Sequence, residues 1–179
     1  MNVLHGLTGS VASTLFSKIR NRYVCDKDKR FDARYIITSS SQNFIKVDDF
    51  WFGDDEMNND EKEWEEYRLY SKVLHIELCK WADAFVIAPL SANTLAKIAN
   101  GICDNLLTCV SRAWDFNKPF IVVPAMNTNM WNHPITKEHL DKISSWGIKI
   151  VPPVEKTLFC GDTGIGAMAN VEDIIKIIK

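Results

Sequence analysis

Short apolar runs alternate with amphipathic segments along most of the chain. In five of these runs the apolar residues follow one another without regular polar alternation, which is typical of strands buried on both faces. They occupy residues 3–7, 34–38, 84–89, 119–124 and 148–153. The pattern therefore predicts five buried strands.

The amphipathic segments carry apolar residues at the three- and four-residue spacing of a helix face. We expect helices in the segments VASTLFSKIR (11–20), SQNFIKVDDFW (41–51), VLHIELCKWAD (73–83), ANTLAKIANG (92–101), NLLTCVSRAW (105–114), TKEHLDKISSWG (136–147) and VEDIIKIIK (171–179). Gly101 and Gly147 stand at the ends of two of these segments, where glycine commonly stops a helix.

Strands that alternate with helices predict a parallel sheet with helices on both faces. The expected fold is a doubly wound, three-layer α/β domain of the flavodoxin or Rossmann type. The 179 residues suffice for one such domain and barely for two, and no linker or internal repeat interrupts them. We therefore predict a single domain over residues 1–179.

One segment breaks the alternation. From residue 48 to 66 the chain becomes acidic and loses its apolar periodicity, as in DDFWFGDDEMNNDEKEWEE. We expect an excursion around a short helix here, with a solvated face as the first interpretation and a substrate lid as the second.

Charge and composition narrow the partners. The chain has 21 Lys and Arg against 23 Asp and Glu, and no long basic cluster, so nucleic acid is not an expected partner. Apolar stretches such as residues 84–90 fall far short of the roughly 20 residues of a membrane span, and the N-terminus lacks a secretory pattern. We therefore expect no membrane partner and a cytoplasmic location.

The five cysteines are scattered at positions 25, 79, 103, 109 and 160, with no C-x-x-C spacing. Zinc and dithiol redox sites need such spacing, so we expect reduced thiols and no metal site.

In doubly wound sheets, ligands bind beyond the carboxyl ends of the strands. The loops at that edge are residues 8–10, 39–41, 89–93, 124–127 and the stretch after Pro153. The first, Thr8-Gly9-Ser10, offers glycine and free amides that suit a phosphate, although Ser10 as an ordinary helix cap explains it equally well. The serine run of the second loop adds donors and favours an anion.

Polar residues crowd the loop PLSAN more than one helix cap requires, which indicates a ligand as strongly as a structural role. The octapeptide PAMNTNMW at 124–131 would suit a flat, partly apolar ligand held by amides, whereas Met130 and Trp131 could also simply plug the sheet edge. His75 lies among apolar residues and reads more readily as a hydrogen-bonded core histidine than as a catalyst.

Cys160 lies in LFCGDTGIGAM, where Gly161, Gly164 and Gly166 indicate a mobile loop rather than the interior of an element. A cysteine has no packing reason to be in such a loop, so we expect Cys160 to be functional.

Three of these segments together resemble a known family. PAMNTNMW resembles a P-x-M-N-x-x-M-W motif, residues 74–108 resemble a His-bearing helix followed by a flavin-binding segment, and CGDTGIGAM resembles a substrate clamp. The segments follow the order of the homo-oligomeric flavin-containing cysteine decarboxylases, and the similarity runs from about Val3 to about Met168. The chain is identified as a member of that family.

The resemblance implies FMN held between the subunits of a homotrimer, with its phosphate near the first loop. The implied FMN contacts are Gly9, Ser10, Val11, Ser40, Phe44, Ser91, Ala92, Asn93, Thr94 and Ala125. It also implies that His75 is the catalytic base, that Cys160 is the proton donor, and that Asn127 binds the substrate carboxylate beside Met130 and Phe159.

The resemblance is to the branch that serves coenzyme A biosynthesis. It implies decarboxylation of 4'-phospho-N-pantothenoylcysteine to 4'-phosphopantetheine: flavin oxidises the substrate to a thioaldehyde, carbon dioxide leaves an enethiolate, and hydride returns from the reduced flavin. The family usually carries an Arg pair where this chain has Cys79-Lys80, and Lys cannot reproduce a bidentate grip on a carboxylate.

Two other functions compete with this one. Some relatives act as inhibitory subunits of a protein phosphatase, so a non-catalytic flavoprotein regulator is the alternative, although His75, Asn127 and Cys160 all occur in this one chain. Flavin electron transfer or flavin modification on a related fold is a third hypothesis, which would leave Cys160 without a role.

Overall fold

The computed structural model describes residues 1–26, 28, 30–45, 57–70, 72–157 and 163–178. Its centre is a parallel sheet of six strands in the order β3-β2-β1-β4-β5-β6. The strands are β1 (Asn2–Leu7), β2 (Asp32–Ile37), β3 (Met57–Asn58), β4 (Ala84–Leu90), β5 (Phe120–Pro124) and β6 (Lys149–Ile150). The strand order reverses direction between β1 and β4, which places the switch point of the sheet there.

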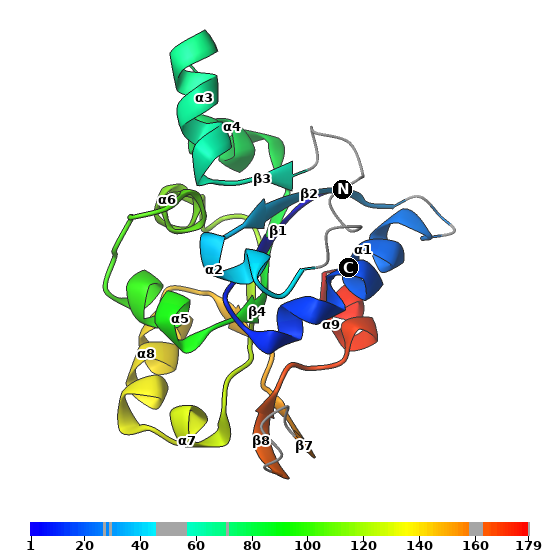
Figure 1. Ribbon diagram of the computed structural model, residues 1–179, viewed down its shortest axis with the longest axis vertical. Coiled ribbons are helices and arrows are strands. Elements are labelled where there is room, and N and C mark those ends of the chain that lie inside the picture. The colour runs from blue at the N-terminus through cyan, green and yellow to red at the C-terminus, as the bar shows by residue number, and fades with distance from the viewer. Residues whose placement is uncertain (27, 29, 46–56, 71, 158–162, 179) are drawn as a thin grey trace.

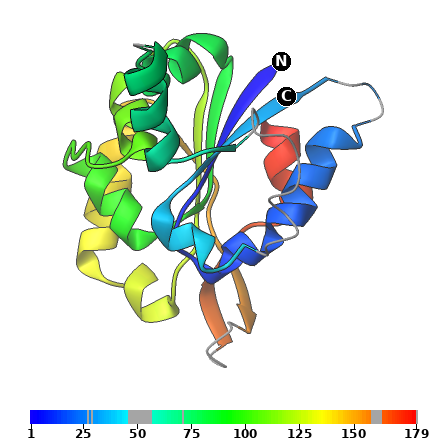
Figure 2. The same cartoon turned by 45° about the horizontal axis from the view of Figure 1, so that its top comes forward.

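Helices cover both faces of this sheet (Figure 1, Figure 2). One face carries η1 (Val11–Leu15), α1 (Phe16–Val24) and α9 (Val171–Ile177). The other carries α4 (Leu74–Trp81), α5 (Ala92–Ala99), α6 (Leu106–Ala113) and α8 (Pro134–Ser144). The predicted doubly wound, three-layer α/β fold is therefore confirmed.

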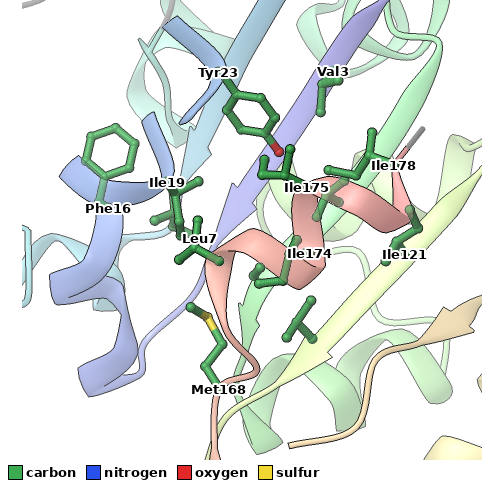
Figure 3. Close-up of a cluster of buried hydrophobic side chains, with 14 of the residues drawn as sticks. Val3, Leu7, Phe16, Ile19, Tyr23, Ile121, Met168, Ile174, Ile175 and Ile178 are labelled. Carbon is green, nitrogen blue, oxygen red and sulfur yellow. The ribbon is translucent and has the colours of Figure 1, made fainter. Parts of the chain in front are cut away.

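The core consists of two apolar clusters, one on each face of the sheet. Alternate residues of β4 enter different clusters: Val86 packs under α1 and α9, whereas Phe85 and Ile87 pack under the opposite helices. Figure 3 shows the first cluster, in which Phe16 and Ile19 of α1 and Ile174 of α9 face the sheet. Burying each such side chain contributes roughly 1.5 to 3 kcal/mol to folding. This burial holds the helices against the sheet and so keeps the strand ends in place.

The serine run differs from its expected position in the chain of elements. Helix α2 spans Ser39–Gln42, so the serines form the helix instead of preceding it. Phe44 lies beyond its last turn, and most of the segment expected to be helical, 46–51, is outside the described residues. The predicted helix is therefore present at Ser41 and Gln42, absent at residues 43–45, and stays a prediction for 46–51.

A two-stranded antiparallel sheet was not expected after Pro153. Strand β7 (Val154–Thr157) pairs with β8 (Thr163–Ala167), where the glycines predicted a mobile loop. That prediction is wrong for Gly164 and Gly166, which lie within β8. At both positions a Cβ atom would collide with the segment that follows β5, so glycine is required for close packing.

The acidic excursion forms helix α3 (Asp60–Tyr70), while residues 48–56 are outside the described part. Glu61 and Glu65 are exposed as a solvated face requires, but Glu63 is buried. The first interpretation of this segment therefore holds for only one side of the helix.

Among the described residues, no helix has both the length and the apolar character to cross a membrane. Within the same residues, no group of three or more His, Cys, Asp and Glu side chains could hold a metal ion.

Candidate active site

A polar cleft of about 260 Å³ opens at the carboxyl edge of the sheet, beside the switch point between β1 and β4. It is lined by Gly9, Thr38, Ser39, Ser40, Asp60, Ser91, Asn93, Thr94, Lys97, Asp104 and Asn105. Of the residues expected to bind FMN, Gly9, Ser40, Ser91, Asn93 and Thr94 are therefore brought together. The first three come from the ends of three different strands, as parallel topology predicts.

Gly9 allows two of these loops to touch. A Cβ atom at Gly9 would lie 2.6 Å from Cβ of Ser40, closer than two such atoms approach in real structures. The turn after β1 and the first turn of α2 can therefore meet only because residue 9 has no side chain. This contact, rather than a positive φ angle, explains the glycine in the first loop.

Side-chain hydrogen bonds tie the first loop to the loops after β4 and β5. The buried Thr8 hydroxyl donates to the carbonyl of Pro89 at 2.8 Å and accepts from the amide of Ser91 at 2.8 Å. The Ser10 hydroxyl donates to the carbonyl of Ala125 at 3.1 Å. These bonds hold three strand ends in one arrangement.

Helix α5 begins at the cleft with an ordinary N-terminal cap, as expected if the polar residues of the PLSAN loop have a structural role. The Ser91 Oγ atom accepts from the amide of Thr94 at 3.2 Å. Asn93, by contrast, is exposed, and no partner for its amide is found among the described residues. Of the polar residues in this loop, Ser91 therefore has a structural role, whereas Asn93 faces solvent and the cleft.

Two carboxylates in the cleft were not anticipated. The Asp60 side chain accepts from the amide of Leu106 at 2.7 Å, at the start of α6. Asp104 pairs with Lys97 at 2.5 Å, and this hydrogen bond is the main cause that holds the pKa of Asp104 below its usual range. The sequence does not reveal either contact. Asp60 and Leu106 are far apart in the chain, and the end of α5 separates Lys97 from Asp104.

The loop after β5 leads into helix α7 (Thr128–Trp131). The Asn127 side chain caps α7 by accepting from the amide of Asn129 at 2.8 Å. Met130 is exposed, whereas Trp131 is half-buried and packs against the second core cluster. The plug interpretation is therefore correct for Trp131 and wrong for Met130.

Strand β8 packs directly on this loop. The amide of Met126 donates to the carbonyl of Gly166 at 3.0 Å. Gly166 has a φ of 152°, and a Cβ atom there would lie 2.2 Å from the carbonyl oxygen of Met126. A Cβ atom at Gly164 would lie 2.6 Å from Oγ1 of Thr128. The glycines therefore let β8 lie against the Asn127 loop.

Phe159 and Cys160, expected to bind substrate and to donate a proton, lie outside the described residues. The described strands β7 and β8 precede and follow them in sequence, and β8 is hydrogen-bonded to the loop that carries Asn127.

His75 lies on α4 and does not line the cleft of its own chain. Its Nδ1 atom is hydrogen-bonded to a carboxylate oxygen of Glu63 on α3. Sequence reasoning missed Glu63, because its environment depends on how two helices pack.

Several other expected FMN contacts do not line the cleft. Ala125 is buried, Phe44 and Ala92 are half-buried, and Ser10 caps η1, which begins at Val11. The Cys79-Lys80 pair is also elsewhere: Cys79 Sγ contacts the carbonyl of Val110, burial raises its pKa to about 11, and Lys80 pairs with Glu77 on the surface.

Comparison with known proteins decides the family. The model of the family described as Flavoprotein matches residues 1–179. The chain belongs to the Flavoprotein family. A phosphopantothenoylcysteine decarboxylase of Glycine max, HAL3a, is 49% identical to this flavoprotein over 179 residues, which is 99% of this chain and 82% of that protein.

Two solved structures extend the likeness to the fold of this flavoprotein. A cysteine-to-serine mutant of a PPC decarboxylase, complexed with pantothenoylaminoethenethiol, has a TM-score of 0.90 and 45% identity, covering 99% of this chain and 95% of that one. The FMN binding protein AtHal3 has a TM-score of 0.85 and 46% identity, covering 99% and 94%.

Proposed function

We propose that this flavoprotein decarboxylates 4'-phospho-N-pantothenoylcysteine to 4'-phosphopantetheine with bound FMN, and that residues 1–179 act as one catalytic domain. The observation that carries the proposal is near-complete coverage at 45% identity by a PPC decarboxylase whose ligand retains an ethenethiol group. An ethenethiol has the double bond that a cysteine amide acquires when it is oxidised and then loses carbon dioxide.

The residues of the cleft fit FMN. A flavin nucleotide presents a phosphate, ribityl hydroxyls and the polar edge of its ring, and the serine, threonine and asparagine side chains around the cleft are suitable partners. The cleft carboxylates would repel a phosphate, but the Asp104 charge is paired with Lys97 and Asp60 is bonded to a backbone amide. We propose that the phosphate binds at the turn formed by Gly9, Ser10 and Val11, of which Gly9 lines the cleft.

The remaining contacts are proposed to come from loops that already meet at the cleft. They are Ser40, Phe44, Ser91, Ala92, Asn93, Thr94 and Ala125. When bound, FMN supplies two-electron oxidation and reduction, which the protein side chains cannot provide.

The side chains of the protein bind substrate and move protons. His75 is the proposed base that takes the proton released as the substrate is oxidised, and the Asn127 amide the proposed ligand of the carboxylate that leaves as carbon dioxide. Met130 and Phe159 are proposed to shape the substrate pocket. Cys160 is proposed to donate a proton to the carbon skeleton of the enethiolate, which the ethenethiol of the structural neighbour resembles.

We also propose a homotrimer with FMN at the subunit interface, in the cytoplasm. His75 does not line the cleft of its own chain, so a shared site supports the assembly: the imidazole of one subunit would serve the cleft of another. Apolar side chains that project from α3 into solvent offer a surface for the contact.

The test begins with the purified protein. We expect it to be yellow, or to become so with added FMN, and to release carbon dioxide from 4'-phosphopantothenoylcysteine. In Cys160→Ser we expect carbon dioxide and reduced flavin without 4'-phosphopantetheine, whereas Cys103→Ser, at an exposed cysteine, should behave as wild type. A protein that neither binds FMN nor releases carbon dioxide would refute the proposal.

A further inference from the structure

Helix α3 carries one acidic side chain that is buried against another helix. Glu63 is 8% exposed, whereas Glu61 and Glu65 on the same helix are exposed. Its carboxylate contacts Nδ1 of His75 at the start of α4. A carboxylate loses favourable hydration on burial, so it stays ionised only with a good hydrogen-bond partner. His75 is the partner that the structure provides.

We propose that Glu63 is a positioning residue for His75, which fixes the ring tautomer and orients Nε2 as the atom that accepts the substrate proton. The inference rests on the proposed function, because it assigns the base of that reaction. An ionised carboxylate can only accept hydrogen bonds, so the Nδ1 atom of His75 must carry the ring proton. In the neutral ring Nε2 then keeps its lone pair.

The environment of Nε2 agrees with this role. The His75 side chain is 26% exposed, so part of it is accessible to solvent. No hydrogen bond to Nε2 is found within the part of the chain that the structure describes. A base needs one anchored and one available nitrogen, and His75 shows this division.

The sequence fixes Glu63 through the first turn of α3. The Asn59 side chain caps the helix by accepting from the amide of Lys62 at 2.9 Å, and the Glu63 amide donates to the carbonyl of Asn59 at 3.2 Å. Asp60, three residues before Glu63 and thus near the same side of the helix, holds the start of α6. Glu63 therefore reaches His75 from a helix end attached at two points.

The charge of Glu63 adds to its geometric effect. When His75 takes up a proton, the buried carboxylate stabilises the imidazolium at short range. Cys109 on α6 is a titratable group that feels the charge of Glu63. Burial, followed by the influence of Glu63, Cys103, Asp60 and Asp104, raises its pKa to about 11, so the thiol stays neutral at pH 7.

Nitrogen-15 NMR of histidine-labelled protein tests the tautomer without any need for activity. The His75 signals are assigned by their loss in His75→Gln. In wild type and Glu63→Gln, whose amide oxygen can still accept, we expect the proton on Nδ1. In Glu63→Ala we expect a shift toward the Nε2-protonated form. Glu65→Ala removes an equal charge from the exposed side of α3 and should leave the signals unchanged.

Rapid-reaction kinetics test the consequence. We expect Glu63→Gln to slow flavin reduction by substrate about 10-fold, through the lost charge, and Glu63→Ala about 10²- to 10⁴-fold, because the tautomer is lost as well. KM should stay within about twofold, since Glu63 does not touch the substrate.

Wild-type tautomer signals and rates in Glu63→Ala would overturn the proposal, as would equal slowing in Glu65→Ala. If Glu63→Ala does not fold, Glu63→Gln decides by its rate alone. A wild-type protein that releases no carbon dioxide would refute the proposed function, while the NMR comparison would still decide whether Glu63 fixes the ring.

Discussion

His5 lies at the centre of the sheet, fully buried, and both of its ring nitrogens are hydrogen-bonded. Nδ1 lies 3.0 Å from the hydroxyl of Tyr23, and Nε2 lies 2.8 Å from the carbonyl oxygen of Ala88. Burial lowers its pKa from 6.5 to about 4, against a smaller opposite effect of the Ala88 carbonyl. His5 therefore has a structural role in the core, whereas His75 has a carboxylate partner.

This burial predicts a pH-dependent stability. Between pH 6.5 and 4 the unfolded chain binds a proton at residue 5 and the folded protein does not, so stability falls as the pH is lowered through this window. The loss attributable to His5 is roughly 3 kcal/mol. Urea unfolding at pH 7 and pH 4.5 should show a smaller drop for His5→Phe than for wild type. An equal drop in both proteins would show that His5 does not cause it.

At the scale of elements, the apolar pattern alone predicted the elements whose residues are apolar throughout. Strand β4 is apolar throughout and its position was predicted almost to the residue. The start of α2, strand β8 and the inward side of α3 were not predicted, because each depends on a tertiary contact. These contacts are Gly9 on Ser40, Gly166 on Met126, and Glu63 on His75.

The residues of the candidate site also divide into those that the sequence pattern predicts and those that depend on tertiary contacts. Ser40, Ser91 and Asn93 could be expected together because parallel strands present their following loops at one edge. Asp60, Lys97 and Asp104 could not, since they reach the cleft from a helix start, a helix interior and the turn before α6. Phe159 rests on the family resemblance and Cys160 on its glycine-rich context as well, and both remain predictions.

The Asp60 carboxylate on α3 is hydrogen-bonded to the start of α6, so this contact should stabilise the folded protein. Asp60→Ala removes the carboxylate that accepts from the amide of Leu106, so we expect a loss of about 1 to 2 kcal/mol in the free energy of unfolding. Glu61→Ala, at an exposed neighbour on α3, should change it by less than about 0.5 kcal/mol. Urea titrations followed by circular dichroism measure both, and indistinguishable midpoints would contradict the assignment.

At the scale of the whole molecule, α3 projects from one end of the α/β body (Figure 1). Trp64, Leu69 and Tyr70 on this helix are 61%, 63% and 63% exposed. Such a group of large apolar side chains is unusual on a surface that stays in water, and it supports burial against another subunit.

The proposed trimer predicts a specific weakening. We expect light scattering of the FMN-loaded protein to give three times the chain mass, and Trp64→Ser combined with Tyr70→Ser to shift the population toward monomer on dilution. Val24→Ser, at a side chain 60% exposed on α1, should leave the assembly intact. A wild-type protein that is monomeric at every concentration would exclude a site shared between subunits.

The hydroxyl of Thr8 bridges the ends of β1 and β4 from a position with no exposed surface. The floor of the cleft is therefore preorganised by folding, before any ligand arrives. A cofactor that docks there need not spend its interaction energy on ordering these strand ends, so more of that energy remains as affinity. Backbone shifts on loading should accordingly be small at this floor.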